Sequence, residues 1–273
     1  MNRDRVQPLS ALPAAALNGL RGVLTDIDDT LTTGGAITAE ALAALSLLRA
    51  AGLPVVAITG RPMGWSEPFA RPFPQGWPID AIVAENGAVA LFHEGGAPRV
   101  EYAQDEATRQ RNTRRLREAA ARVLREVPGA CLATDSAGRV TDIAVDHGEH
   151  AHLGPGQIER VVAVMRAQGM SASVSSIHIN GWFGEHDKLS GARWIVRRLF
   201  GRELDTECER WVYVGDSTND QLMFGHFPLS IGVANLLRFE SELRVWPAYL
   251  TQHARGAGFA ELAHHLLKVR LAA

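Results

Sequence analysis

Short runs of apolar and β-branched residues recur along the chain, and they constrain its fold more than any other feature. They lie at residues 22–25, 54–59, 79–84, 211–215 and 228–233. Helical patterns separate them, because leucines at helical spacing cover 39–51 and an amphipathic pattern covers 188–200. Strands that are apolar along their whole length are typical of parallel sheets with helices on both faces. The sequence therefore predicts an α/β fold with a doubly wound parallel sheet.

The middle of the chain has a different pattern. It holds a hairpin pattern at 88–92 and 99–102, an arginine-rich helix at 105–127, a second helix at 158–168, and alternating strands at 139–145 and 171–179. Alternating strands belong to sheets with one face that is exposed or free of helices. We therefore predict a smaller α/β domain at residues 87–180, inserted into a core made of residues 1–86 and 181–273.

Composition limits the classes of partner. The chain has 273 residues, of which 46% are hydrophobic, enough for one large or two moderate domains. A formal charge of −2 argues against nucleic acid, which is bound through a broad basic surface. No stretch approaches 18 uninterrupted apolar residues, so no membrane span is predicted. A homodimer is compatible with the sequence, which leaves the oligomeric state open.

The cysteines and the N-terminal segment favour a cytoplasmic location. Cys131 and Cys208 lie far apart in no CxxC pattern, which favours packed thiols over a disulfide framework or a structural zinc site. The first 22 residues weakly resemble an export signal, but Asp4, Pro13 and Asn18 interrupt their basic and apolar runs. A reducing cytoplasm is therefore the predicted compartment.

Polar residues follow three of the predicted strands. They are the segments DIDDT at 26–30, TGR at 59–61 and GDSTND at 215–220. Ligands of open α/β sheets bind beyond the carboxyl ends of the strands, where these five carboxylates would converge and repel one another without a cation between them. Mg²⁺ suits oxygen ligands and also binds phosphate, and Lys188, at the start of a helix, offers a charge suited to a phosphate.

These segments resemble the four motifs of the haloacid dehalogenase (HAD) superfamily. DIDDTLT is similar to the first motif, Asp-x-Asp-x-Thr, and ITGR is similar to the second, with Thr59 as its hydroxyl residue. Lys188 lies where the third motif has its lysine, and GDSTND matches the fourth, GDxxND. The four occur in the family's order. The resemblance implies a Rossmann-like core and an enzyme of the phosphatase type.

The resemblance extends to subclass IIB, whose cap domain is inserted between the second motif and the lysine. The segment from Glu85 to Ala88 (ENGA) resembles the crossing into that cap. This subclass includes trehalose-, sucrose- and mannosylglycerate-type sugar-phosphate phosphatases, Cof-like phosphatases and phosphomannomutases. The match to the cap rests on position, length and element order.

The resemblance implies a role for each matching residue of the core. Asp26 would attack phosphorus and become an aspartyl phosphate, and Asp28 would protonate the leaving oxygen and then deprotonate water. The metal ligands would be the side chains of Asp26 and Asp216 and the backbone carbonyl of Asp28. Thr59 and Lys188 would hold the phosphoryl oxygens.

Other positions are expected to support the substrate. Asp220 would orient Lys188 or a metal-bound water, and Asn219 would add a hydrogen bond. The expected substrate contacts are Thr59, Gly60, Arg61, Asn86, Lys188 and Asn219, with His178 and Asn180 from the insert. Each assignment has a structural alternative, such as a capping acid for Asp28, a solvated lysine for Lys188 and a surface ion pair for Arg61.

Position 29 departs from the subclass pattern, which often has glycine where this chain has Asp29. An extra acid beside the site adds repulsion unless it points to solvent or caps the next turn. We interpret Asp29 as a tolerated variant, with an altered metal or substrate preference as the alternative.

The insert carries weaker signals. The acids and histidines Asp142, Asp146, His147, His150 and His152 match no firm zinc spacing, so solvated loop residues are favoured over substrate contacts or a metal. Ser176, His178 and Asn180 are expected on one alternating strand face, either exposed to solvent or in contact with sugar hydroxyls. The arginines from 109 to 125 are spread around their helix, which indicates a solvated face.

The leading hypothesis is a magnesium-dependent phosphatase of a small phosphorylated metabolite, with sugar phosphates as the favoured class. A phosphosugar mutase that transfers the phosphoryl group to a sugar is one alternative. A non-catalytic phosphate- or magnesium-sensing module, which stores phosphate on Asp26, is the other.

Overall fold

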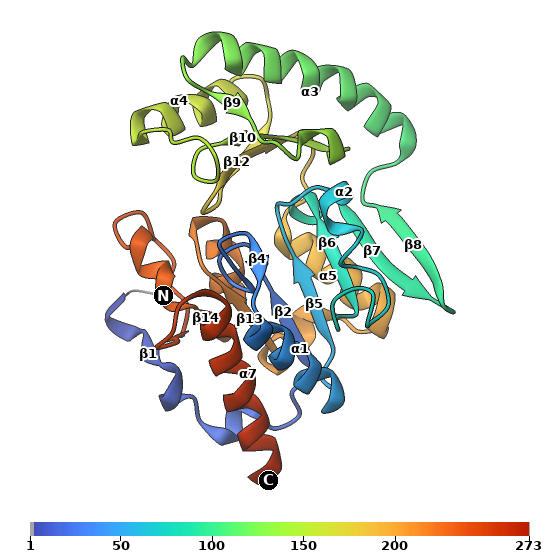
Figure 1. The fold of residues 1–273 in the computed structure, drawn as a ribbon, viewed down its shortest axis with the longest axis vertical. Coiled ribbons are helices and arrows are strands. Elements are labelled where there is room, and N and C mark those ends of the chain that lie inside the picture. The colour runs from blue at the N-terminus through green and yellow to red at the C-terminus, as the bar shows by residue number, and fades with distance from the viewer. Residues whose placement is uncertain (1–2, 273) are drawn as a thin grey trace.

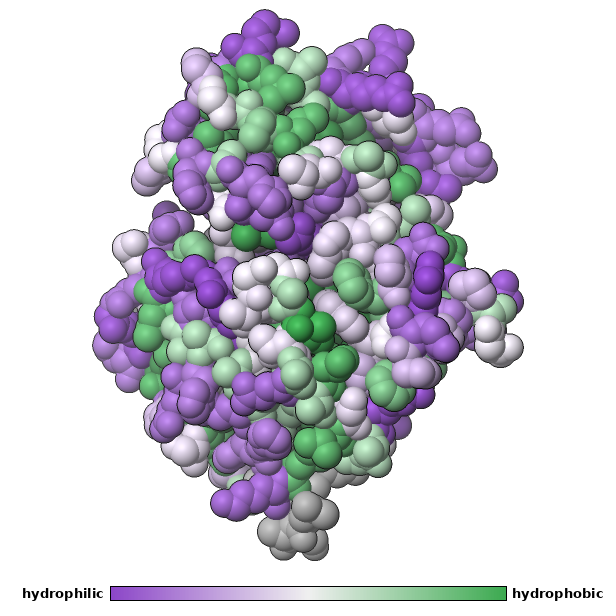
Figure 2. All heavy atoms as spheres, in the orientation of Figure 1, coloured by the Kyte–Doolittle hydropathy of each residue, from purple (hydrophilic) through white to green (hydrophobic). Residues whose placement is uncertain are grey.

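The computed structural model describes residues 3–272, which form a larger part and a smaller part stacked end to end (Figure 1). The chain enters the smaller part once, between two stretches of the larger one. Figure 2 shows hydrophilic residues along the junction between the two parts. Within the described residues, no helix combines the length and apolar character that crossing a membrane requires.

A nine-stranded sheet is the centre of the larger part. Its order is β1-β15-β14-β13-β2-β5-β6-β7-β8, and all neighbours from β1 to β6 are parallel. The strands are β1 (Gln7–Pro8), β2 (Gly22–Thr25), β5 (Val55–Ile58), β6 (Ala81–Ala84), β7 (Val89–Glu94), β8 (Ala97–Tyr102), β13 (Trp211–Gly215), β14 (Leu229–Gly232) and β15 (Tyr249–Leu250). A small hairpin, β3 (Thr32–Thr33) with β4 (Ala36–Ile37), follows β2.

Helices cover both faces of this sheet (Figure 1). One apolar cluster joins the sheet to α1 (Ala39–Ala50) and α7 (Arg255–Ala272), and a second joins its other face to α5 (Lys188–Phe200) and α6 (Gln221–His226). Successive residues of one strand enter different clusters, as Val23 and Leu24 do. Because both faces are covered, the central strands are apolar at most positions, and the predicted doubly wound fold is confirmed.

The smaller part is an antiparallel sheet covered by two helices. The strand order is β11-β12-β10-β9. Its elements are α3 (Glu106–Glu126), β9 (Cys131–Leu132), β10 (Asp142–Asp146), α4 (Pro155–Arg166), β11 (Ser171–Val174) and β12 (His178–Trp182). A third apolar cluster, separate from the two of the larger part, joins these elements. We call this part the cap.

The boundary of the insert differs from the predicted one at residue 87. The hairpin of β7 and β8 extends the nine-stranded sheet, because β7 pairs antiparallel with β6 from Ala84–Val89 to Ala81–Phe92. The cap elements therefore begin at α3. A hairpin pattern shows that two strands pair with each other, but it does not show which sheet they join.

Two predicted strands of the cap are shorter than expected. The segment 171–179 is not one strand, because a turn at 175–177 separates β11 from β12. In this turn the hydroxyl of Ser175 accepts hydrogen bonds from the amides of Ile177 and His178. The prediction that Ser176 shares a strand face with His178 and Asn180 is therefore wrong. Likewise, β10 begins only at Asp142, after a short 3-10 helix at Ser136–Gly138.

Two glycines bring the start of α5 against the end of β6. A Cβ on Gly191 of α5 would lie 2.6 Å from the Cα of Gly87, and a Cβ on Gly87 would lie 2.0 Å from the backbone oxygen of Asp187. Gly87 also has a φ of 105°, which disfavours any side chain. Only glycine at both positions lets α5 begin here, and α5 begins with Lys188.

We expect Gly191→Ala to destabilise the protein by roughly 1–3 kcal/mol, because overpacking against backbone outweighs the ~1 kcal/mol gain in helix propensity. Activity should fall as well, since α5 must shift together with Lys188. Urea unfolding and turnover would measure both effects. Gly225→Ala in α6 is the matched control, because its new Cβ would meet nothing closer than 3.4 Å. Equal stability of the two variants would contradict this account.

Candidate active site

Two neighbouring strands place the acids of the first and fourth motifs side by side. Asp26 follows β2 and Asp216 follows β13, and the amide of Asp26 donates to the carbonyl of Val214 at 2.9 Å. Carboxylate oxygens of Asp26, Asp216 and Asp220 all lie within 4.8 Å of one another. All three residues are buried, Asp26 at 4% exposure and the other two at 0%. The predicted convergence of these segments is therefore observed.

Lys188 lies between two of these carboxylates. Its Nζ donates to Oδ1 of Asp26 and to Oδ1 of Asp220, each at 2.7 Å. Helix α5 holds the lysine in place, because the side chain of Asp187 caps its N-terminus by accepting from the amide of Ser190 at 2.7 Å. Lys188 is 3% exposed, so the alternative of a solvated lysine is wrong.

Asp220 is fixed by donors on both of its oxygens. Oδ1 accepts from the hydroxyl of Tyr213 in addition to Lys188. Oδ2 accepts from the amides of Asp216 at 2.9 Å and Ser217 at 3.1 Å. The carboxylate therefore ties the GDSTND loop to Lys188, which agrees with the predicted orienting role.

Burial makes the negative charge in this cluster costly. It raises the pKa of Asp26 to about 7 against the opposing effect of Lys188, and Asp220 and Asp28 add to the rise. Burial also raises the pKa of Asp216 well above its usual range, and the charges of Asp26 and Asp220 raise it further. One ammonium group faces three carboxylates, so the site has room for more positive charge.

The donor set fits a hard divalent cation. Oδ1 of Asp216 is buried without a hydrogen-bond partner, while its Oδ2 accepts from Nδ2 of Asn235 at 3.0 Å. No donor occupies the second oxygen of Asp26 among the described hydrogen bonds either, since Lys188 binds only Oδ1. Clustered carboxylate oxygens with free lone pairs are the ligands that Mg²⁺ prefers. Asp28's backbone carbonyl remains a predicted third ligand.

Asp28 is held by Arg61, and through it by the cap. The guanidinium donates to both oxygens of Asp28 at 2.9–3.0 Å, and also to Asp135 at 3.2 Å and Glu149 at 2.7 Å. Burial alone would lower the pKa of Arg61, but the charges of Asp28 and Glu149 outweigh it and raise the pKa. Arg61 is 4% exposed, so the alternative of a surface ion pair is wrong, and the arginine lies in a buried junction between core and cap. The predicted contact of Arg61 with the substrate stays a prediction.

Four further hydrogen bonds hold the cap against the core. The carbonyl of Gly60 accepts from Arg139 at 3.0 Å and from Nδ2 of Asn180 at 3.2 Å. Glu85, at the end of β6, accepts from the amides of Val140 and Thr141. The two parts are therefore joined by hydrogen bonds between buried or half-buried groups.

His178 and Asn180 lie at this junction and are both 2% exposed. His178 contacts Glu149 at 3.1 Å, and Asn180 also donates to Asp142 at 2.9 Å. The alternative of a solvent-exposed sheet face is therefore wrong. The predicted contact with sugar hydroxyls stays a prediction.

The other predicted substrate residues are close to the same centre. Thr59 is buried, and its hydroxyl accepts from the amide of Arg61 at 3.0 Å. Nδ2 of Asn86 is buried without a partner, near Gly60. Asn219 instead accepts from the hydroxyl of Ser217 within its own loop. Thr59 and Asn86 are thus available to a ligand, whereas Asn219 supports the loop.

The acid-and-histidine stretch of the insert has a structural role. Both oxygens of Asp146 accept from the amides of the loop that follows, at residues 148 to 151. Among the described residues, Asp26, Asp216 and Asp220 are the group that could hold a metal, and this stretch forms none. Asp142 and Asp146 lie in β10 and are 3% and 1% exposed, so the prediction of solvated loop residues is wrong for these two acids.

Several residues of the site have no local signal in the sequence. Glu85, Arg139 and Glu149 reach the junction from separate elements, and Asn235 reaches Asp216 from the loop after β14. No spacing pattern links them to the motifs. Asp29 is a further case, because its carboxylate forms ion pairs with Arg238 at 3.0 Å and Arg255 at 2.9 Å.

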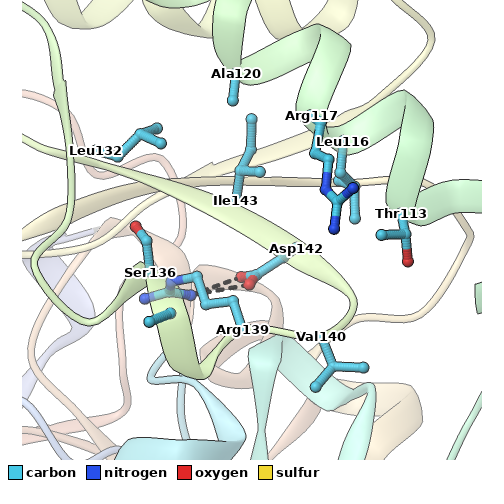
Figure 3. A pocket seen from close by; sticks show the side chains of 11 residues that line it. Thr113, Leu116, Arg117, Ala120, Leu132, Ser136, Arg139, Val140, Asp142 and Ile143 are labelled. Carbon is cyan, nitrogen blue, oxygen red and sulfur yellow. Dashed lines mark hydrogen bonds and ion pairs between the residues drawn. The ribbon is translucent and has the colours of Figure 1, made fainter.

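Two cavities lie near these groups. One of about 340 Å³ lies between core and cap and is lined by Asp28, Asp29 and Arg61. The other, of about 320 Å³, lies inside the cap between α3 and β10 (Figure 3). Its walls are apolar, and the ion pair of Arg139 with Asp142 forms part of its lining. Only the first cavity reaches the motif residues.

Comparison with known proteins agrees with this geometry. The sequence model of a family described as haloacid dehalogenase-like hydrolase matches residues 23–112, which contain the first two motifs. The chain has the HAD fold. The predicted resemblance to this superfamily is confirmed over those residues. No curated protein sequence matches the chain.

Solved HAD structures match almost the whole chain. A protein from Thermoplasma acidophilum has a TM-score of 0.66 at 17% identity and covers 91% of this chain and 98% of its own. The sucrose-phosphatase of Synechocystis, solved with sucrose and phosphate, has a TM-score of 0.63 at 15% identity and covers 90% and 98%. A HAD subclass IIB sugar phosphatase has 0.61 at 17% identity and covers 91% and 99%. At these identities the likeness concerns the fold.

We expect Asp216→Asn to abolish stabilisation by Mg²⁺ while raising stability in EDTA, because the amide removes a buried charge that repels Asp26 and Asp220. A ligand at 100 times its Kd stabilises a fold by about 2.7 kcal/mol. Differential scanning fluorimetry with Mg²⁺ and with EDTA would measure both effects. Asp205→Asn, at an exposed ion pair with Arg193, is the control. A full magnesium shift in the Asp216 variant would disprove the assignment.

We expect Arg61→Lys to loosen the cap, because one ammonium cannot bind Asp28, Asp135 and Glu149 in the geometry of a planar guanidinium. The amides of Val140 and Thr141, which donate to Glu85 across the junction, should exchange hydrogen faster. Hydrogen-exchange mass spectrometry measures this, and kcat should fall roughly tenfold or more. Arg193→Lys is the control. Unchanged exchange at both amides would show that Arg61 does not hold the cap.

Proposed function

We propose that the chain is a magnesium-dependent phosphomonoester hydrolase that acts on a small phosphorylated metabolite through an aspartyl-phosphate intermediate. One observation carries the proposal. Lys188 binds one oxygen of Asp26 and leaves the other free, inside a buried carboxylate cluster that calls for a cation. Sugar phosphates are the favoured substrates, supported by the names of the sucrose-phosphatase and the sugar phosphatase of like fold.

In the first step the free oxygen of Asp26 attacks phosphorus. The bond between phosphorus and the leaving oxygen breaks, and Asp28 gives its proton to that oxygen. Lys188 neutralises charge on the phosphoryl oxygens, and Thr59 offers them a hydroxyl. For this step Asp28 must turn from Arg61 toward the leaving group, since Arg61 now binds both of its oxygens.

In the second step water replaces Asp26 on phosphorus. Asp28, now a carboxylate, takes a proton from the water, whose oxygen attacks phosphorus while the bond to Asp26 breaks. Phosphate leaves and Asp26 is regenerated.

Asp26 and Asp216 would hold Mg²⁺ through their side chains, with the carbonyl of Asp28 as the predicted third ligand. When bound, the ion neutralises charge that develops on the transferring phosphoryl group. Asp220 is occupied by Lys188, Tyr213 and two amides, so its role is to orient the lysine.

The cap would exclude water from the phosphoryl group and select the substrate. Its junction with the core lies directly beside Asp28, so closing the cap and positioning the acid are linked through Arg61.

We propose a cytoplasmic location as well, because Cys131 and Cys208 are both free thiols.

Asp26→Asn should lower turnover roughly 10³-fold or more, since an amide oxygen is a poor nucleophile and forms no stable phosphoenzyme. The assay is phosphate release from a panel of phosphorylated sugars, glycerates and nucleotides, with Mg²⁺ and then with chelator. Asp205→Asn is the control. Undiminished turnover in the Asp26 variant would end the mechanism.

The same assay separates the two alternatives. A mutase would give an isomerised phosphosugar without net phosphate release. A sensing module would accumulate a phosphorylated Asp26 that persists rather than turning over within seconds.

A further inference from the structure

We infer that the substrate carries a second anionic group, a carboxylate or another phosphate, and that Arg238 and Arg255 bind it. The inference rests on the proposed phosphatase function and narrows its substrate class. It places the specificity contact on the core, at the mouth of the cavity between core and cap.

The leaving group must lie in this cavity. Asp28 has to reach the leaving oxygen to protonate it, and Asp28 lines the cavity of about 340 Å³. Arg238, from the loop after β14, and Arg255, at the start of α7, line the same cavity from the core side. The cap contributes His150 and Ser176, and the hydroxyl of Ser176 is buried without a hydrogen-bond partner. A volume of this size holds a small metabolite.

The two arginines carry more positive charge than their protein partner neutralises. Nη2 of Arg238 lies 3.0 Å from Asp29 and 3.9 Å from Asp216, and Nε of Arg255 lies 2.9 Å from Asp29, so the two guanidinium groups have Asp29 as their one close carboxylate. No described hydrogen bond uses Nη1 of Arg238 or the terminal nitrogens of Arg255. Their side chains are 47% and 35% exposed, so these donors can reach a ligand.

The other charged groups of the cavity do not compete for this anion. Arg61 is already saturated by Asp28, Asp135 and Glu149. Both oxygens of Glu149 face partners in the cavity wall, Arg61 at 2.7 Å and His178 at 3.1 Å. The uncompensated positive charge therefore lies at Arg238 and Arg255 alone among the described residues that line the cavity.

The arginine pair is built rigidly onto the catalytic loops. Asp29 and Arg255 both have left-handed backbone, with φ of 55° and 57°, a conformation that costs free energy in residues other than glycine. Asn235 joins them, because its Oδ1 accepts from the amide of Arg255 and its Nδ2 donates to the carbonyl of Asp29 and to Asp216. One arginine would suffice to neutralise Asp29, so a second, held at this cost, indicates a ligand.

Guanidinium groups bind carboxylate and phosphate through paired N–H donors, which makes them selective for such anions over hydroxyl groups. The test therefore compares substrates that differ only in the second group. One pair is 3-phosphoglycerate against glycerol 3-phosphate. A second is 6-phosphogluconate against sorbitol 6-phosphate, and a third is glucose 1,6-bisphosphate against glucose 6-phosphate. The first two pairs report on a carboxylate and the third on a second phosphate.

We expect kcat/KM of the wild type to be roughly tenfold or more higher for the member of at least one pair that carries the second anionic group, the scale of a charge-assisted hydrogen-bond pair. The doubly substituted Arg238→Gln, Arg255→Gln protein should lose this ratio. A merely structural role of the arginines would instead lower both members of a pair equally. Arg193→Gln is the matched control, since Arg193 binds Asp205 at 2.9 Å with 43% exposure away from the cavity. The single Arg255→Gln variant replaces the double one if that protein does not fold.

The outcomes distinguish the inference from the function beneath it. If the wild type hydrolyses the members of every pair equally well, or if the ratio survives in the variants, the anion site is refuted and the phosphatase stands. If the wild type releases no phosphate from any ester, the phosphatase proposal fails and takes the anion site with it.

Discussion

The contact of Lys188 with Asp26 and Asp220 is the interaction on which the rest of the site depends. Three carboxylates are buried at the carboxyl edge of the sheet, where each is raised in free energy by lost hydration and by its neighbours. The ammonium group removes part of that cost and fixes which oxygen of Asp26 remains free. The oxygen of Asp26 that is free to act as the proposed nucleophile is therefore determined by Lys188 as well as by the position of Asp26 itself.

That contact depends in turn on backbone packing far from any charge. Gly87 and Gly191 let α5 begin against the end of β6, which is why the lysine at its first position reaches β2 and β13. The same contact of α5 with the end of β6 places Glu85 where it accepts hydrogen bonds from amides of the cap. The close approach of Gly87 and Gly191 thus sets the positions of both Lys188, the proposed phosphate-binding cation, and the entrance of the cap.

The sequence predicts the parts of this site that are local. Strand ends followed by acids, the bounds of α5 and β13, and the helix α3 are all set by patterns of a few neighbouring residues, and they match the structure closely. The membership of β7 and β8, the turn at 175–177 and the three carboxylates around Arg61 are set by contacts between distant segments. A single sequence does not show which distant segments lie in contact, so it leaves open whether Arg61 is a surface residue or a buried one.

The acids at the junction of core and cap differ from Asp216 in their cationic partners, and this difference supports the proposed position of a metal. Asp28, Asp135 and Glu149 share Arg61, Asp142 is bound by Arg139, and Asp29 by Arg238 and Arg255. Asp26 and Asp220 share Lys188.

Among these acids Asp216 alone has a buried oxygen without any donor. The nearest guanidinium nitrogen, of Arg238, is 3.9 Å from the other oxygen of Asp216. Each of the other carboxylates has an arginine or lysine nitrogen within 3.2 Å, whereas Asp216 has none so close and lies in one cluster with Asp26, the proposed nucleophile. Evolution of a buried arginine at that point would have balanced the charge, but it would also have filled the position that a phosphate oxygen needs. A small cation that binds carboxylate and phosphate together satisfies both requirements.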